Sequence, residues 1–411
     1  MKYVRTHETR DKFLADKDST SRGFRLAPTL YKYSDESEDE DNRDHIYLEL
    51  DDPRKHEGST YMEIALNSDT EFSFYIGNKT GDTQTTMTCT VDWGDDTIET
   101  MTITKDTYGF KLAHNYVAGS YKIELYDVER DYSVVGDVAN TRSLISPIES
   151  VKRVVLSERV NSIGDWTFYK CTSLTSIFIP EGITYIGSRT LAICQSLTSI
   201  YIPESVNSIG DRVLDGCYDL KLVYIPEGVT RIVQGMFYGC RSLKSIVIPE
   251  SVTIIGSQAF DSCRSLTSVY IPEGVTSIGY TAFGTCTSLK SIYIPEGVTI
   301  INRYTFYNCT SLKSINIPKG ITTIKQYAFY KCRSLKSIDI PEKATSIEDS
   351  VFQDCSSLTS ISSFNLTTPT LGGNIFLNLP TNGTLHIKPG AIGYDAWLSK
   401  LPEGWRIVED L

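Results

Sequence analysis

Apolar residues recur with a period of 23 residues over more than half of the chain, from residue 141 to residue 362. Each unit follows the pattern L-x-x-I-x-I-P-E-G-V-T-x-I-G-x-x-x-F-x-x-C. A clear copy, read from the second isoleucine of the pattern, starts at Ile271. The leucine and the two isoleucines at positions one, four and six predict one strand with an inward apolar face. The V-x-x-I segment that follows predicts a second short apolar edge. The segment that ends in F-x-x-C predicts a short helical or 3₁₀ turn. A fixed period of this length is typical of stacked coils, so we expect a solenoid of about nine repeats.

Proline ends the first strand of each unit, at a point where no backbone N–H donor is needed. Glycine follows two positions later in five of the eight copies and provides a permissive turn. Ser205, Ser251 and Lys343 replace this glycine in the other copies, so the turn does not require positive φ. The prolines are Pro180, Pro203, Pro226, Pro249, Pro272, Pro295, Pro318 and Pro341.

Nine of the ten cysteines occupy one position of the repeat, and the tenth, Cys89, lies outside it. Each repeat cysteine has a phenylalanine or leucine three positions before it and a leucine three positions after it. No pair has the C-x-x-C spacing of a zinc site. The pattern predicts a column of buried free thiols that act as small apolar residues, with occasional disulfides between neighbouring coils as the alternative. The column comprises Cys171, Cys194, Cys217, Cys240, Cys263, Cys286, Cys309, Cys332 and Cys355.

Residues 58–140 carry short alternating runs instead of the repeat, with predicted strands at 72–76, 86–91, 98–103 and 121–125. Glycine-containing turns separate these runs, which predicts a small β-sandwich. The expected fold class is therefore mainly β with short helices: a solenoid preceded by an Ig-like β-sandwich.

Three motifs in this segment resemble those of a PKD-type Ig-like domain: Val91-Asp-Trp-Gly-Asp-Asp96, His114-Asn-Tyr116 and the strand that starts at Gly119. The resemblance implies a role in spacing and adhesion rather than chemistry. For His114 we expect a hydrogen-bonded structural role. The aspartates of the first motif are expected to cap a tight turn, with a calcium site as the alternative.

The two ends of the chain lack the repeat. Residues 1–57 predict a charged N-terminal arm, because Ser34–Asp44 is acidic and contains no apolar residue, so it should be solvated. The arm has no apolar segment of the signal-peptide type, and docking on a larger assembly is one role for it. Residues 363–411 predict a C-terminal cap, since an open last coil would expose its apolar columns and strand edge.

The repeat strongly resembles the BspA-type leucine-rich repeat, in which leucine, isoleucine, phenylalanine and cysteine columns recur at this length. Proteins that carry this repeat occur mainly on the surfaces of gut and oral anaerobes, on some protists and in phages of such bacteria. The resemblance implies an adhesin that binds host or matrix proteins.

One residue of each coil points outward between the inward isoleucines, and successive coils place these residues about 4.8 Å apart. One interpretation is structural, because tyrosine suits an exposed strand and cross-strand stacking. The other is a binding strip, because exposed aromatic patches with polar rims mark interaction sites. The candidate binding residues are Phe178, Tyr201, Tyr224, Val247, Tyr270 and Tyr293, with Lys244 and Lys290 from a mildly basic edge; the outward positions then become polar at Asn316, Asp339 and Ser362.

The composition of the 411 residues narrows the function. A formal net charge of −11 argues against a nucleic-acid partner. No apolar run is long enough to span a membrane. The five histidines are scattered, and none of the common nucleophile, phosphate-binding or zinc motifs occurs, so we expect no catalytic residues, metal or cofactor.

The sequence therefore predicts a non-catalytic, surface-exposed binding protein that recognises a protein or glycan on a host or bacterial surface. Two alternatives remain. A virion component, such as a head or tail fibre or decoration protein of a phage, would need no signal peptide. An intracellular interaction scaffold would suit nine reduced thiols. Expected locations are the cell surface, the extracellular space or the virion.

Overall fold

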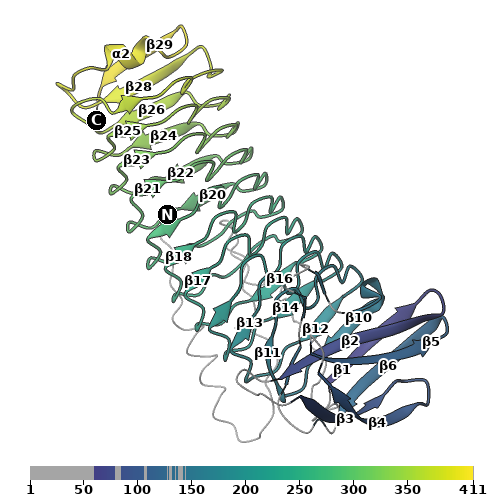
Figure 1. Ribbon diagram of the computed structural model, residues 1–411. Helices are drawn as coiled ribbons and strands as arrows, with labels where there is room; N and C mark the ends of the chain where they lie inside the picture. The colour runs from purple at the N-terminus through teal and green to yellow at the C-terminus, as the bar shows by residue number, and fades with distance from the viewer. Residues whose placement is uncertain are drawn as a thin grey trace, which may run out of the picture. The chain divides into compact units, whose positions relative to one another are not determined.

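The computed structural model describes most of the chain from Thr60 onwards (Figure 1). The predicted N-terminal arm, with its acidic run, lies outside the described residues. The described ranges are 60–78, 85–105, 109–126, 128, 132–134, 136–137, 142–143 and 145–410.

The first strands form antiparallel pairs in two sheets. In one sheet, β6 (Gly119–Tyr126) pairs with both β1 (Thr60–Leu66) and β3 (Thr86–Asp92), and β3 also pairs with β4 (Ile98–Thr104). In the other sheet, β2 (Thr70–Asn78) pairs with β5 (Phe110–Tyr116) and with β7 (Tyr132–Val134). The completely buried side chains of this region are Phe72, Met87, Cys89, Val91, Trp93, Phe110 and Leu112.

The turn after β3 is held by its own polar side chains. Asp92 Oδ1 accepts the Gly94 N–H at 2.8 Å, and Asp95 Oδ1 accepts the Thr97 N–H at 3.2 Å. The His114 ring stacks on Trp93 with centroids 5.0 Å apart, and its Nε2 lies 2.8 Å from Asp95 Oδ2. These contacts give the aspartates and the histidine structural partners. The PKD-type assignment of these strands stays a prediction.

Both N-terminal sheets continue directly into the solenoid. β10 (Val151–Val155) pairs antiparallel with β1 on one side and parallel with β12 (Ser176–Phe178) on the other. In the second sheet, β11 (Val160–Ile163) pairs parallel with β7 and with β13 (Tyr185–Ile186). The backbone groups of the first coil are therefore hydrogen-bonded instead of forming an open edge.

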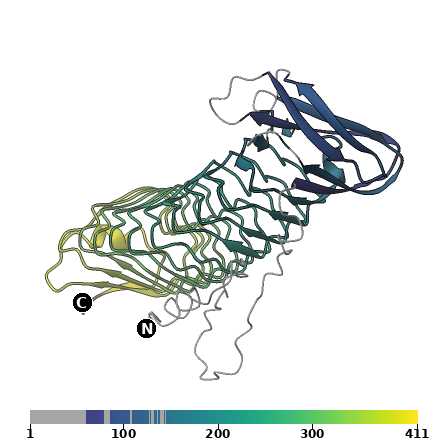
Figure 2. The same ribbon diagram turned by 90° about the horizontal axis from the view of Figure 1, so that it is seen from below.

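The solenoid coils stack parallel strands on two sides (Figures 1 and 2). Strands of the first side, which carries the outward positions discussed above, are β12, β14 (Ser199–Tyr201), β16 (Leu222–Tyr224), β20 (Ser291–Tyr293), β22 (Ser314–Asn316), β24 (Ser337–Ile340) and β26 (Ser360–Ser363). Strands of the second side are β11, β13, β15 (Ser208–Ile209), β17 (Arg231–Ile232), β18 (Ile254–Ile255), β19 (Ser277–Ile278), β21 (Ile300–Ile301), β23 (Thr323–Ile324), β25 (Ser346–Ile347) and β27 (Thr370–Leu371).

The third side of each coil is a run of turns. F-x-x-C closes one turn of the 3₁₀ type, in agreement with that part of the prediction, because the Cys263 N–H bonds to the Phe260 carbonyl at 3.1 Å. The turn does not extend into a helix. Residues two positions before and two after the phenylalanine have positive φ, as at Thr281 (54°) and Thr285 (55°). These values interrupt a right-handed helix. The N–H groups of these residues bond to the next coil instead, as from Thr285 to the Tyr307 carbonyl at 2.6 Å. Helices in the described ranges are limited to η3 (Ile148–Ser150) and α2 (Asp395–Leu398).

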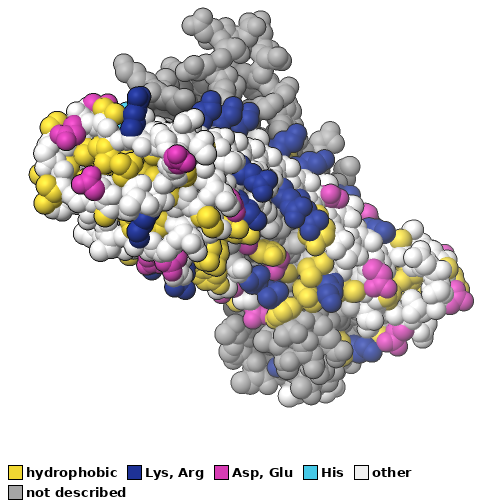
Figure 3. Space-filling view, turned by 90° about the horizontal axis from the view of Figure 1, so that it is seen from above, with side chains coloured by type: hydrophobic (Ala, Val, Ile, Leu, Met, Phe, Trp, Pro, Cys, Tyr) yellow, Lys and Arg dark blue, Asp and Glu magenta, His cyan; other side chains and the backbone are white. Residues whose placement is uncertain are grey.

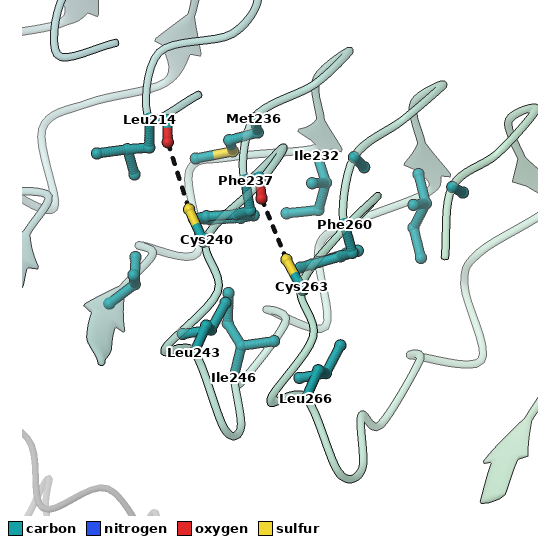
Figure 4. Packing of buried hydrophobic residues seen from close by; sticks show 14 of the residues in the cluster. Leu214, Ile232, Met236, Phe237, Cys240, Leu243, Ile246, Phe260, Cys263 and Leu266 are labelled. Atoms are coloured by element: carbon teal, nitrogen blue, oxygen red, sulfur yellow. Dashed lines mark hydrogen bonds between the residues drawn. The ribbon is translucent and has the colours of Figure 1, made fainter. Parts of the chain in front are cut away.

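Stacked phenylalanines and cysteines fill the interior (Figure 4). Phe237 and Phe260 lie parallel with centroids 5.3 Å apart, and the stack continues through Phe283, Phe306, Phe329 and Phe352. All nine repeat cysteines are free and completely buried, which confirms the prediction of a thiol column.

The C-terminal residues extend the first strand face beyond the last repeat. β28 (Gly383–Ile387) and β29 (Trp405–Glu409) continue the sheet after β26. Trp397 of α2 lies 6.0 Å from the Phe376 ring and is 2% exposed. Among the described residues, no helix is long and apolar enough to cross a membrane.

Candidate functional site

The candidate site is the outward column of the first strand face, which we call the aromatic strip: Phe178, Tyr201, Tyr224, Val247, Tyr270 and Tyr293. Each of these side chains lies between two neighbours that point inward. This holds also for Val247 and Tyr270, where the structure assigns no strand, because the residues on either side of them are buried. Ile200 and Ile202 on either side of Tyr201 are 2% and 1% exposed. The repeat pattern thus fixes which residue of each coil reaches the surface.

Parallel pairing brings members of the strip into register. Tyr201 is the direct partner of Tyr224, and Tyr293 is the partner of Asn316. Phe178 pairs with Val155 of β10, so the strip begins beside the strand that joins the solenoid to one of the N-terminal sheets. The structure therefore brings the predicted residues onto one face.

Tyr201 and Tyr224 form a parallel stack, with ring centroids 4.9 Å apart and an interplanar angle of 11°. The Tyr224 hydroxyl donates a hydrogen bond to the Glu204 carboxylate. Burial, together with the charges of Glu181 and Glu204, raises the pKa of Tyr201 to about 12. Burial and the bond to Glu204 also raise the pKa of Tyr224. Both phenols are therefore neutral at physiological pH.

The side chains of the strip do not project fully into solvent, so the strip forms a flat surface. Its aromatic residues are half-buried, while Val247 is 52% exposed. The stacked rings of Tyr201 and Tyr224 are held by each other and by Glu204, so these two side chains lose little conformational freedom when a partner binds.

Opposite charges border the strip. Seven of the eight prolines that end a strand are followed by glutamate, which forms an acidic edge. Several of these carboxylates accept N–H groups of the next coil, as Glu181 does from Ser205 at 3.2 Å and Glu227 from Ser251 at 3.3 Å. On the basic edge, Lys244 and Lys290 are exposed. Sequence reasoning missed the acidic edge, although the recurring Pro-Glu dipeptide was a signal for it.

A second aromatic group lies on the turn side of the solenoid and was also missed. Tyr304 stacks on Tyr327 at 5.0 Å, and Tyr307 stacks on Tyr330 at 5.4 Å. Edge-on contacts of 5.7 Å and 5.6 Å join the two stacks. The signal for it was tyrosine two positions before and one after the phenylalanine in two successive repeats.

A family model for the BspA type leucine rich repeat region matches six copies, over residues 146–267 and 253–382. The chain belongs to the BspA-type leucine-rich repeat family. The match begins near β10 and does not include β1–β6.

The BspA-type chain is also similar to several solved structures. A leucine-rich repeat protein from Bacteroides ovatus is 20% identical, with 78% of this chain and 98% of that chain covered and a TM-score of 0.39. One from Eubacterium ventriosum is 19% identical, covering 82% and 85%, with a TM-score of 0.46. The T. pallidum leucine rich repeat protein is 28% identical, covering 45% and 83%, with a TM-score of 0.36. No curated protein matches the chain.

The described part of this BspA-type protein holds no group of three or more His, Cys, Asp or Glu side chains placed to bind a metal. Proteins of the BspA-type family are typically non-catalytic, and the matched family model is not that of a catalytic family. The arrangement of the strip, a flat aromatic surface between charged edges, is suited to binding.

Proposed function

We propose that this protein is a non-catalytic, surface-exposed binding protein that recognises a protein or glycan through the aromatic strip. The observation that carries the proposal is the parallel stack of Tyr201 and Tyr224, in strand register and held by Glu204. Aromatic residues within a polar rim are characteristic of the centres of binding interfaces.

Membership of the BspA-type family supports the same role, because the resemblance implies adhesins on cell surfaces. We propose the cell surface or the extracellular space as its location, with a phage virion as the alternative. Protease shaving of intact cells tests the location, since a surface protein loses its solenoid to the protease. Recovery of the chain only in purified phage particles would support the virion instead.

Val247→Asp is the most informative single variant of the strip. Val247 is 52% exposed, so a carboxylate there should leave the thermal midpoint nearly unchanged while it disrupts a contact with an apolar or anionic partner. Val117, 64% exposed in the connection between β5 and β6, provides the matched control Val117→Asp. Binding of the full chain is measured on arrays of purified matrix proteins and of glycans.

We expect Val247→Asp to weaken the strongest array signals at least tenfold, and Val117→Asp to leave them unchanged. Combined replacement of Tyr201, Tyr224, Tyr270 and Tyr293 by serine should abolish the same signals. A Val247→Asp protein that binds like the wild type would contradict the proposal.

A further inference from the structure

One stretch of the solenoid has a charge opposite to that of the whole chain. Between Cys286 and Lys336 the sequence contains eight Lys or Arg residues and one acidic residue, Glu296, a net charge of +7 in a protein of net charge −11. Figure 3 shows a row of Lys and Arg side chains along the solenoid. This stretch is therefore locally basic within an acidic protein.

Three of these cations occupy the same position in consecutive coils. Lys313 N–H donates to the Lys290 carbonyl at 2.9 Å, and Lys336 N–H donates to the Lys313 carbonyl at 3.5 Å. Directly bonded strands lie about 4.8 Å apart, so Lys290, Lys313 and Lys336 form one column along the solenoid axis. We call this set the lysine column.

The lysine column is exposed and has no acidic counterpart in the described part of the chain. All three side chains are exposed, and none forms an ion pair with a described carboxylate. Glu296, the acidic residue of this stretch, belongs to the acidic edge of the strip and not to the basic edge that carries the lysine column. Its carboxylate accepts the backbone N–H of Lys319 at 3.2 Å. Like charges on adjacent strands repel one another, so a bound polyanion would relieve this repulsion.

We propose that the lysine column binds a linear anionic glycan, with its chain parallel to the solenoid axis. This inference rests on the proposed function, because the column forms the basic edge of the same strand face. It specifies the ligand class: a polysaccharide that carries sulfate or carboxylate groups at regular intervals.

The period of the column favours a glycan over an acidic peptide. In an extended peptide, side chains on one face recur about every 6.6–6.8 Å, which does not match a strand spacing of about 4.8 Å. A pyranose ring in an extended chain spans a length close to that strand spacing. Beside the column, Tyr293 and Asn316 are register partners that present a phenol and an amide for sugar hydroxyls.

The charged edges also fix the orientation of the ligand. A polyanion that crossed the strip would meet the acidic edge, whereas one that follows the column stays clear of it. Asp339 is exposed on the strand that follows Lys336 and marks one end of the favourable surface.

The test is binding of the full chain to immobilised heparin and hyaluronan, with polyglutamate as the peptide probe. The variant is Lys290→Gln, Lys313→Gln and Lys336→Gln combined. Lys319→Gln, Lys325→Gln and Lys343→Gln combined removes the same charge from other positions of the solenoid and serves as the control. All six side chains lie on the surface or at its margin, and thermal melts verify that both variants fold.

We expect the wild type to bind at least one of the two glycans in a salt-sensitive manner. The column variant should bind about tenfold more weakly, as the loss of three exposed ion pairs predicts, and the control should stay within about twofold. Equal losses in both variants, no binding to either glycan, or tighter binding to polyglutamate would overturn the proposal. If the glycans fail while strip variants still lose their array partners, the proposed function stands without this ligand class.

Discussion

The Cys263 thiol donates a hydrogen bond to the Phe237 carbonyl of the preceding coil, with sulfur and oxygen 3.1 Å apart (Figure 4). Both side chains are completely buried. The same bond recurs from Cys194 to Cys355, 26 residues back along the chain in every case. The Phe237 carbonyl also accepts the Cys240 N–H at 3.1 Å, so the thiol is a second donor to the same buried oxygen and occupies little volume.

The cysteines should therefore be unreactive in the folded protein. Burial raises the pKa of Cys89 to about 11 and that of Cys309 to about 12, so the thiolate is scarce at pH 8. Titration with Ellman's reagent should detect fewer than one thiol per native chain, and all ten in concentrated guanidinium. Rapid reaction of several thiols without denaturant would contradict the packing.

Gly279→Ala should destabilise the solenoid by about 1–3 kcal/mol, because its new Cβ would lie 2.4 Å from the Ser257 backbone nitrogen. Gly274→Ala is the matched control, since its nearest neighbours would lie 3.6 Å away. Urea unfolding of the two variants measures the difference. Later coils have Asn302, Lys325 and Glu348 at the position of Gly279, so this close approach is not common to all coils.

Thr281→Gly should raise the free energy of unfolding by up to about 1 kcal/mol. The φ of Thr281 is 54°, and glycine relieves a cost of about 1–2 kcal/mol there, offset in part by its freedom in the unfolded chain. Thr276→Gly, at an exposed position without positive φ, should lower the free energy of unfolding instead. The same sign for both variants would show that the left-handed conformation is not the cause.

Asp261→Asn should stabilise the protein only at higher pH. Burial raises the pKa of Asp261 from 3.8 to about 6, and the side chain is 9% exposed. Its raised pKa favours folding below pH 3.8, where the acid is protonated in both states, and this advantage is lost as the pH rises through 6.

The Asp261→Asn variant should therefore gain up to about 3 kcal/mol over the wild type at pH 8, and close to nothing at pH 4. Urea unfolding at the two pH values measures this, with Asp211→Asn, an exposed aspartate, as the control. An equal gain at both pH values would exclude ionisation as the reason.

Much of the fold could be predicted from the sequence, because the solenoid depends on local periodicity. The inward isoleucines, the strand-ending prolines and the buried thiols each follow from one position of the repeat. The outward position of Tyr201 follows in the same way. Its stack on Tyr224 agrees with the interpretation of these tyrosines as cross-strand stacking partners. The bond from the Tyr224 hydroxyl to Glu204 required coordinates, because it joins residues about one repeat apart.

The sequence by itself determined the period, the columns and the face that carries the strip, since each is set by hydrophobic burial within a coil. Only the tertiary structure decided the left-handed turns at residues such as Thr281, whose N–H bonds to the Arg303 carbonyl of the next coil. It also decided that β10 and β11 join the two N-terminal sheets to the solenoid. Hydrogen bonds between coils and between sheets determine the left-handed turns and this junction, and no local sequence pattern predicts these bonds.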